Sequence, residues 1–480
     1  MPKPVDRFHT SPTFVQKIAI MTESLKDFLT ASDKKSFDKE HKRKLLFNIS
    51  QYDKKVVEGK LIYSDLNLAK ERASHLKTKA INNLDKYLIE FEAAFVKRGG
   101  KVLWAENAEQ AINEVLKIAK KVNAKTLVKA KSMVTEEIHL NHHMEKAGIE
   151  SIETDLGEYI QQLDGEPPYH IVTPAMHKSK EDVAKLFHEK KGLPEGSSPS
   201  DIMAYVRRIL RDKYAEAELG ITGGNFLVAD IGAIGITENE SNQFMSVAFP
   251  KTIISIVGIE KMIPTLADLD LFFPLLAVHG TGQKVTVYNT LLTGPRQAEE
   301  PDGPDEMYVI LLDNGRTNLL AQPDQREALN CIRCGACLNA CPIYRNVGGH
   351  SYATTYSGPI GSVITPHLSG FDDFRHLSFA SSLCGRCTEV CPVKIDIHKH
   401  LLHNRRDTVN QNYPSKVENL SMFFWKKVTL SRKNMNKGGA SVKNFFLNSF
   451  FKSSWGDRRE MPQLAQKSFN ERWREKKGLK

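Results

Sequence analysis

Four cysteines stand at the spacing that iron–sulfur proteins use. The stretch "CIRCGACLNACP" (residues 331–342) has the order Cys-x2-Cys-x2-Cys-x3-Cys-Pro. Its cysteines are Cys331, Cys334, Cys337 and Cys341. Two-residue gaps let a loop wrap one cluster with three thiolates, and the three-residue gap turns the fourth thiolate away. Zinc ribbons separate two Cys-x2-Cys pairs by a longer stretch, so the run predicts iron–sulfur binding.

A second run, "SSLCGRCTEVCP" (residues 381–392), repeats this spacing with one change. Its cysteines are Cys384, Cys387 and Cys391, and Ser381 stands in the place of the first cysteine. In two-cluster ferredoxins the fourth cysteine of one run binds the cluster of the other run. That rule predicts that cluster one is held by Cys331, Cys334, Cys337 and Cys391. It predicts that cluster two is held by Cys341, Cys384 and Cys387.

Cluster two is left with three thiolates, and three explanations for its fourth iron compete. Ser381 could bind through its oxygen, although a hydroxyl is a harder and less acidic ligand than a thiol. A water, a substrate or a partner group could take the place, or the iron could be lost to give [3Fe-4S] on oxidation. We expect two [4Fe-4S] clusters, the second with a non-cysteine fourth ligand and prone to lose that iron in air.

Other candidate groups carry weaker signals. Asp155 and Glu158 are carboxylates three residues apart, which suits substrate binding or acid–base chemistry. A helix cap at Asp155 with an exposed Glu158 explains the pair equally well. No Gly-x-Gly-x-x-Gly follows an expected strand, so a nicotinamide or flavin site of Rossmann type is not predicted. The sequence singles out no catalytic residue.

The elements that must position the cysteines form an α/β pattern. Residues 1–65 are polar with a helical period, and that period continues to about residue 120. Short apolar runs then alternate with helical stretches, which predicts a layered α/β fold. The runs predicted to be buried strands are 126–130, 149–154, 170–175, 225–238, 252–263 and 285–292, with another in "MYVILLD".

This pattern divides the chain into four parts. We expect a helical segment (1–65), an α/β domain (66–300), a helical ferredoxin-type domain with two clusters (301–405) and a basic tail (406–480). The stretch 294–306, rich in Gly, Pro and acidic residues, suits a loop or a boundary. The long gap between Cys341 and Cys384 predicts a module larger than a minimal bacterial ferredoxin.

The composition of the chain indicates its cellular compartment and the kinds of partner that it can have. All seven cysteines lie between 331 and 391, which favours metal ligands over disulfides. The chain has no apolar run near the ~20 residues of a membrane span and begins without an apolar signal region, so we expect a cytoplasmic protein. Nucleic acid is not an expected partner.

The positive charge is concentrated at the C-terminal end. From residue 401 onward, 18 Lys and Arg accompany 6 Asp and Glu, a balance that exceeds the +10 of the whole chain. Aromatic residues such as Phe423, Phe424 and Trp425 are interleaved with this charge. The tail suits docking on an acidic partner protein or, peripherally, on an anionic membrane surface. A solvated, partly disordered segment is the equal alternative.

Several longer stretches resemble the lactate utilization protein B family, the iron–sulfur component of a three-protein bacterial L-lactate oxidation system. They are "KAKSMVTEEI", "ETDLGEYIQQLDGEPPYHIVTPAMHKS", "GITGGNFLVADIGAI", "VGIEKMIPTLADL", "LLTGPR" and both cysteine runs through "CPVKIDIH". The resemblance extends along nearly the whole chain. It implies a lactate-utilisation domain distantly like sugar-isomerase and coenzyme-A-transferase folds. It also implies a helical ferredoxin module whose two [4Fe-4S] clusters are carried by the seven cysteines as assigned above.

The resemblance implies an electron-transfer subunit of a complex that oxidises L-lactate to pyruvate, with the A and C components as partners. Such a subunit is non-catalytic or co-catalytic. Two clusters suit a reaction that releases two electrons, since each [4Fe-4S] cluster normally carries one. Two alternatives stay open: a redox subunit for another 2-hydroxy acid such as glycolate, and an α/β domain that itself binds a substrate or effector, with the clusters appended.

Overall fold

The computed structural model describes residues 22–414, 416–455 and 460–478. The first 21 residues of the predicted helical segment 1–65 therefore lie outside the described residues. The described chain falls into two compact units, residues 21–410 and the C-terminal residues from 411 onward. Each unit is described by itself.

Four helices open the larger unit: α1 (Glu23–Ser36), α2 (Lys39–Gly59), α3 (Leu66–Asn82) and α4 (Leu84–Lys97), with a short 3-10 turn η1 (Lys60–Ile62) after α2. Three of them begin at a side chain that accepts a backbone N–H of the first turn, from Thr22, Asp38 and Asp65. These caps satisfy N–H groups that a helix start leaves without partners, which fixes where each helix begins.

A six-stranded sheet forms the centre of the α/β part. Its strands, in spatial order, are β1 (Lys101–Ala105), β10 (Glu306–Leu312), β7 (Thr252–Gly258), β4 (Leu219–Thr222), β2 (Thr126–Lys129) and β3 (Glu150–Glu153). Every neighbouring pair is parallel. All the carboxyl ends therefore meet at one edge of the sheet, where ligands bind in open α/β folds.

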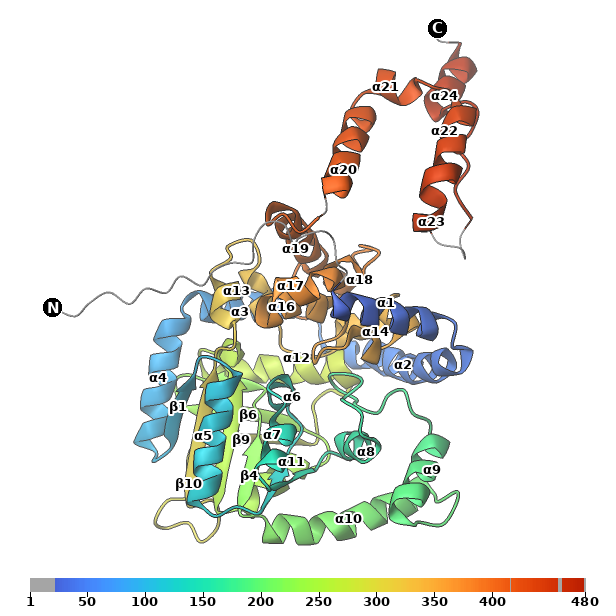
Figure 1. The fold of residues 1–480 in the computed structure, drawn as a ribbon. Coiled ribbons are helices and arrows are strands. Elements are labelled where there is room, and N and C mark those ends of the chain that lie inside the picture. The colour runs from blue at the N-terminus through green and yellow to red at the C-terminus, as the bar shows by residue number, and fades with distance from the viewer. Residues whose placement is uncertain (1–21, 415, 456–459, 479–480) are drawn as a thin grey trace, which may run out of the picture. The chain divides into compact units, whose positions relative to one another are not determined.

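Helices cover both faces of this sheet. Alternate residues of β7 point to opposite faces, so Ile254 and Ile256 pack with α5 (Ala108–Lys121), whereas Ile253 and Val257 pack with α4. Figure 1 shows α5 and α7 lying over one face of the sheet. The other helices of this part are α6 (Met133–Glu137), α7 (Leu140–Lys146), α8 (Leu156–Asp164), α9 (Lys180–Lys191), α10 (Pro199–Glu216), α11 (Asn242–Ala248) and α12 (Leu269–Thr281). The predicted α/β fold is confirmed.

A second, four-stranded sheet lies beside the first. Its order is β8 (Met262–Ile263), β5 (Phe226–Val228), β6 (Ala233–Glu238) and β9 (Tyr288–Leu292). Short 3-10 turns η2 (Ile259–Lys261) and η3 (Leu266–Asp268) connect β7, β8 and α12. Each of these strands falls within a run predicted to be extended.

One predicted strand is wrong. Residues 170–175 form turns, because the ring nitrogen Nδ1 of His170 accepts the backbone N–H groups of Val172 and Thr173. These side-chain bonds replace the ladder that a strand would need. The resulting loop approaches the cysteine region.

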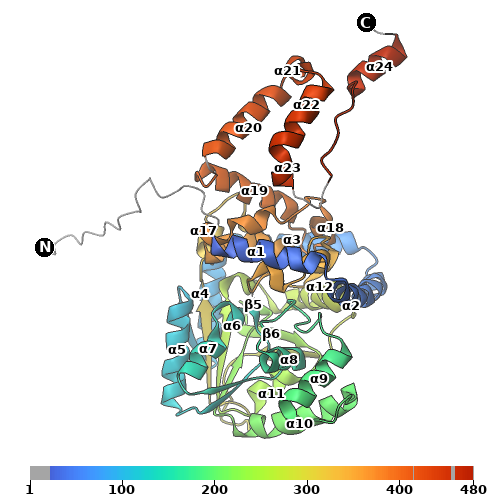
Figure 2. The same cartoon turned by 45° about the vertical axis from the view of Figure 1, so that its right-hand side comes forward.

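The ferredoxin-type module is built from short helices. They are α13 (Arg316–Leu320), η4 (Arg326–Asn330), α14 (Ala336–Ala340), α15 (Tyr344–Val347), η5 (His350–Tyr352), α16 (Gly358–Ser369), α17 (Phe371–Phe374), η6 (Arg375–Phe379), α18 (Arg386–Val390) and α19 (Ile397–Asn410). Figures 1 and 2 both show this module gathered at one end of the large sheet, with α1 and α12 beside it. The predicted helical ferredoxin-type module is confirmed.

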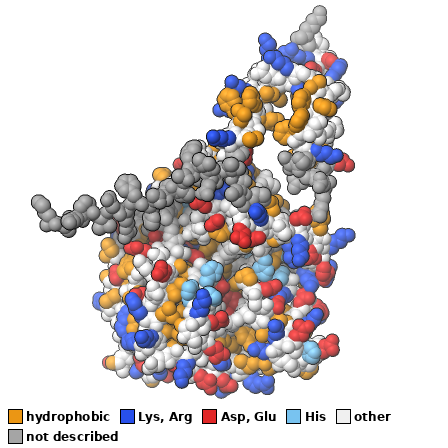
Figure 3. All heavy atoms as spheres, in the orientation of Figure 1, with side chains coloured by type: hydrophobic (Ala, Val, Ile, Leu, Met, Phe, Trp, Pro, Cys, Tyr) orange, Lys and Arg blue, Asp and Glu red, His pale blue; other side chains and the backbone are white. Residues whose placement is uncertain are grey.

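The C-terminal unit is helical: α20 (Lys416–Thr429), α21 (Arg432–Asn436), α22 (Ala440–Phe446), a π-turn η7 (Leu447–Phe451), α23 (Lys452–Trp455) and α24 (Phe469–Lys477). Figure 3 shows hydrophobic side chains gathered over these helices, and Phe423, Phe424 and Trp425 are all exposed. Within the described ranges, no helix has the length and apolar character needed to cross a membrane.

Candidate iron–sulfur site

The first group of cysteines surrounds one small cavity. Cys331 and Cys334 come from the loop between η4 and α14, Cys337 lies in the first turn of α14, and Cys391 follows α18. All four line this cavity, together with apolar side chains such as Ile171, Ile360, Val393 and Ile395. Helices α14 and α18 pack against each other, and this contact brings Cys391 to the first three cysteines. The set is the one predicted for cluster one.

Backbone N–H groups around this group of cysteines donate hydrogen bonds to the sulfur atoms. The N–H of Arg333 donates to Cys331 Sγ at 3.4 Å, and the N–H of Ile395 donates to Cys391 Sγ at 3.4 Å. Gly335 has φ +77°, and a Cβ there would meet the His170 ring at 3.0 Å. Glycine is therefore required both for its backbone angle and for the close approach of the 170–175 loop.

A second group contains the remaining three thiols. Burial, together with the neighbouring Cys341 and Cys384, raises the pKa of Cys387 to about 11. Burial also raises the pKa of the Cys341 thiol, with Cys384 again contributing. Cys341 directly follows α14, Cys384 and Cys387 lie just before and within α18, and α14 packs against α18, so the three thiols lie on neighbouring elements. Cys384 is exposed, whereas Cys341 and Cys387 are buried.

The thiols of the first group also affect one another. Burial and the neighbouring Cys331 raise the pKa of Cys391 to about 12. Cys334 and Cys337 likewise respond to burial first and then to Cys331 and Cys391. Buried thiols with raised pKa values need a metal to become thiolates, and metal binding then releases their protons. The two groups of thiols, the first of them in an apolar cavity, fit iron–sulfur clusters by their donor chemistry.

The two cysteine loops repeat one backbone geometry. Arg333 (φ 61°) precedes Cys334 and Gly335, just as Leu383 (φ 53°) precedes Cys384 and Gly385 (φ 78°). Each loop leads into a five-residue helix, α14 or α18. The two runs are therefore related as structural repeats.

Ser381 occupies the position in this repeat that Cys331 has in the first loop. The N–H of Leu383 donates to Ser381 Oγ at 3.1 Å, as the N–H of Arg333 does to Cys331 Sγ. The Ser381 carbonyl accepts a hydrogen bond from Arg405. The serine oxygen thus lies where the repeat places a ligand atom.

A buried chain of charges stands behind the first group. Arg316 is 1% exposed and donates to Glu260 Oε2 and to both carboxylate oxygens of Glu137. Glu260 also holds Arg333 through Oε1 at 3.3 Å. Burial opposes ionisation of Glu260, but the two guanidinium groups lower its pKa to about 2. Arg333, stacked on the Tyr356 ring at 4.6 Å, is thereby fixed beside the cysteines.

A larger cavity of about 360 Å³ adjoins the first group. Cys334 and Arg333 line both the small and the large cavity. Other walls come from residues that follow β2, β3, β4 and β7, such as Lys131, Asp155, Gly223 and Lys261. It therefore lies at the carboxyl edge of the parallel sheet, between the sheet and the cysteine module. Neither spacing nor periodicity in the sequence pointed to it.

The two carboxylates singled out in the sequence, Asp155 and Glu158, have different environments. Asp155 caps α8 by accepting the N–H of Glu158 at 3.0 Å, as its cap interpretation required. The alternative with an exposed Glu158 does not hold, because Glu158 is 2% exposed and faces Lys129, which also bonds Glu153 at 2.8 Å and Glu136 at 3.0 Å. Burial and the nearby Glu153 raise the pKa of Glu158 well above its ordinary value. The Lys129 ammonium thus neutralises this buried acidic group.

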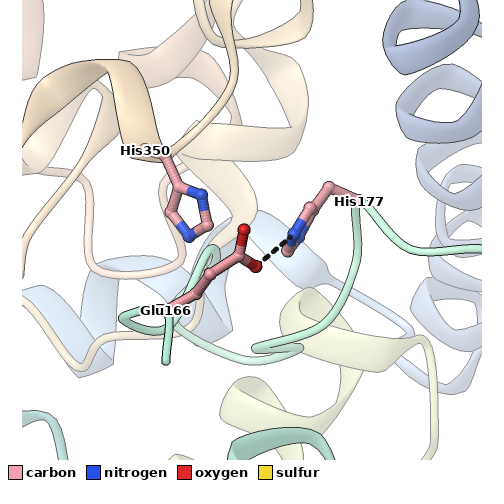
Figure 4. A group of neighbouring side chains, drawn as sticks. All are labelled: Glu166, His177 and His350. Atoms are coloured by element: carbon pink, nitrogen blue, oxygen red, sulfur yellow. Dashed lines mark hydrogen bonds and ion pairs between the residues drawn. The ribbon is translucent and has the colours of Figure 1, made fainter. Parts of the chain in front are cut away.

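A further cluster lies away from the cysteines. Figure 4 shows Glu166, His177 and His350 converging, and their ligand atoms lie within 4.8 Å of one another. His177 Nε2 bonds Glu166 at 3.1 Å, and the Lys178 ammonium bonds the same carboxylate at 3.0 Å. His350 Nε2 is engaged by the Pro167 carbonyl. Because the Lys178 ammonium already pairs with Glu166, its positive charge disfavours a metal ion between these three side chains.

Comparisons with known proteins match both parts of the larger unit. Residues 88–312 match the LUD domain, and residues 327–395 match the 4Fe-4S dicluster domain, so the chain carries an iron–sulfur domain. Lactate utilization protein B of Bacillus cytotoxicus is 42% identical over 420 residues, covering 85% of this chain and 88% of the relative. The protein of the same name from Bacillus thuringiensis is 41% identical with the same coverage.

Proposed function

Because the chain belongs to the lactate utilization protein B family, we propose that it is the iron–sulfur electron-transfer subunit of a system that oxidises L-lactate to pyruvate. The observation that carries this proposal is the grouping of seven thiols into two neighbouring sets on interleaved loops. Four thiols line one cavity, and three lie together beside it. Two redox centres held in one small module suit a two-electron reaction.

In this proposal Cys331, Cys334, Cys337 and Cys391 hold one [4Fe-4S] cluster. The second is held by Cys341, Cys384 and Cys387 with a non-cysteine fourth ligand. The equivalence of Ser381 to Cys331 in the repeated loop supports the serine oxygen as that ligand. When bound, each cluster supplies a one-electron carrier.

The chain's own residues position and tune these centres. Cys337 and Cys341 lie four residues apart and belong to different groups, as do Cys387 and Cys391, so each short helix ties one centre to the other. Backbone N–H groups directed at sulfur and nearby cations such as Arg333 stabilise added negative charge, which favours the reduced state. The protein thereby sets the spacing and the reduction potentials of the two clusters, whereas the electron donor and acceptor are other molecules.

The partners proposed for this subunit are the A and C components of the lactate-utilisation system. The C-terminal helices offer a surface for such a contact, since exposed aromatic side chains there accompany a strong positive charge. The proposed compartment is the cytoplasm, with docking on a partner or peripherally on a membrane surface. The subunit acts as a co-catalytic electron carrier.

The decisive experiment is reduction of the full-length, anaerobically purified chain by L-lactate. The visible absorbance of the clusters should bleach when L-lactate is added together with the A and C components, and much less with glycolate. A Cys331→Ala variant should lose that part of the bleaching that comes from cluster one. Absence of lactate-dependent bleaching with both partners present would refute the proposal, and equal bleaching by glycolate would favour the alternative 2-hydroxy acid.

A further inference from the structure

Two cationic side chains at the cavity beside Cys334 have N–H groups without a hydrogen-bond acceptor among the described residues. Lys261 is 6% exposed, and none of the described residues forms an ion pair with its ammonium or accepts a hydrogen bond from it. The Arg333 guanidinium uses Nη2 on Glu260, but its Nη1 is buried without a partner in the described chain. Both residues line the same cavity of about 360 Å³. Buried cations are costly unless an anion accompanies them.

Other cationic side chains in this part of the chain have hydrogen-bond or ion-pair partners. Lys77 donates to the carbonyls of Glu260 and Met262, and Lys129 is bonded to three carboxylates. Lys131, also on the cavity wall, donates to the Val172 carbonyl. Lys261 and Arg333 differ from these because both line the cavity and each keeps N–H groups that have no acceptor among the described residues.

The lining of the cavity also includes acidic side chains, but these are already bonded. Asp155 and Glu240 accept backbone N–H groups at the start of α8, and Glu238 accepts the N–H groups of Gln243 and Phe244. These carboxylates repel a second negative charge on a ligand, which disfavours dicarboxylates and phosphate esters. They can still accept a hydrogen bond from a ligand hydroxyl.

We propose that this cavity binds a small monocarboxylate bearing a hydroxyl group, with its carboxylate held by Lys261 and Arg333 and its hydroxyl toward the acidic side chains of the lining. The site lies at the carboxyl ends of β7, β4 and β2, where a parallel α/β sheet presents loops to a ligand. Its volume falls within the range of small-molecule sites. The bound acid would lie against Cys334, one of the four thiols of the first group.

The α/β domain thereby acquires a role of its own: it presents the hydroxy acid to the iron–sulfur module. The choice of L-lactate as the occupant rests on the proposed function, whereas the carboxylate site rests on the unpaired Lys261 ammonium and the unbonded Nη1 of Arg333. A cation that served only to balance the charge of a cluster would need no cavity, and this cavity is also lined by polar residues such as Asn225 and Thr237.

Calorimetric titration of the full-length, cluster-loaded chain tests the site. L-Lactate should bind, and lactamide, which keeps the hydroxyl but has no charge, should bind at least about tenfold more weakly. Lys261→Met should weaken L-lactate binding by a similar factor. Lys284→Met is the matched control, because Lys284 is exposed between the lining residues Thr281 and Thr286 and changes the net charge equally.

The outcomes separate the site from the proposed function. Equal binding of lactate and lactamide, or no binding of either, overturns the site even where Lys261→Met fails to fold. An unchanged affinity in a folded Lys261→Met variant, with only a lower cluster potential, also overturns it and makes Lys261 a counter-charge. Lactate binding without partner-dependent cluster reduction supports the site and refutes the relay, whereas reduction without binding does the reverse.

Discussion

Replacing Cys331 and Cys391 by alanine should remove the same cluster, although the two residues come from different motifs. Both residues line one cavity, and the neighbouring Cys331 contributes to the raised pKa of the Cys391 thiol. Cys384 and Cys387 belong to the other group, with Cys341. The chain with both clusters should carry about eight irons. Each single variant, Cys331→Ala or Cys391→Ala, should therefore retain about four irons.

The double variants give the decisive comparison, since effects on one shared unit are not additive. Cys331→Ala combined with Cys391→Ala should still retain about four irons. Cys331→Ala combined with Cys387→Ala should retain almost none, because each change removes a different cluster. Iron analysis of anaerobic preparations and electron paramagnetic resonance of the reduced proteins measure both results, with circular dichroism as the check on folding.

The opposite pattern would refute the reasoning. If Cys331→Ala combined with Cys391→Ala lost nearly all iron while each single change lost half, the two cysteines would hold different clusters. The crossed ligand rule would then fail for this chain, and with it the assignment of Cys341 to the second cluster.

Three other changes have expected outcomes. Ser381→Cys should suppress the [3Fe-4S] resonance that brief exposure to air produces in the unmodified chain, and an undiminished resonance would show that residue 381 does not reach the open iron. Lys129→Met should destabilise folding by about 3–5 kcal/mol, because it leaves Glu153 and Glu158 buried without their cation. The folded-state pKa values of these carboxylates lie above the unfolded ones, so the stability of this variant should fall as the pH rises above about 4, the ordinary pKa of a glutamate, as measured by urea unfolding. A pH-independent deficit would contradict that cause. Ending the chain at residue 410 should leave the iron content unchanged and weaken association with the A and C components at low salt, as measured by sedimentation; association unchanged at every ionic strength would reject docking by the tail.

The sequence supported some predictions about fold better than others. Alternation of apolar runs with helical stretches predicted the parallel sheet, because its strands are buried on both faces and carry continuous apolar residues such as those of β7. The same rule failed for residues 170–175, which are apolar enough for a strand. There His170 takes the N–H groups that a neighbouring strand would have used. Likewise, the sequence left open whether Glu158 is exposed, because nothing near it in the sequence reveals Lys129 as its buried partner.

The sequence by itself determined the cofactor chemistry of this chain, because ligand type and spacing within a loop decide which metal centre can be wrapped, and both cysteine runs are local. It also determined the α/β class and the charge of the C-terminal end, which depend on composition and short-range period. Tertiary structure alone decided that Lys261 and Arg333 share a cavity, that Cys334 forms part of its wall, and that acidic residues line it as well. A cavity is the space left between elements whose positions depend on contacts distributed along the whole chain, so no local pattern encodes it.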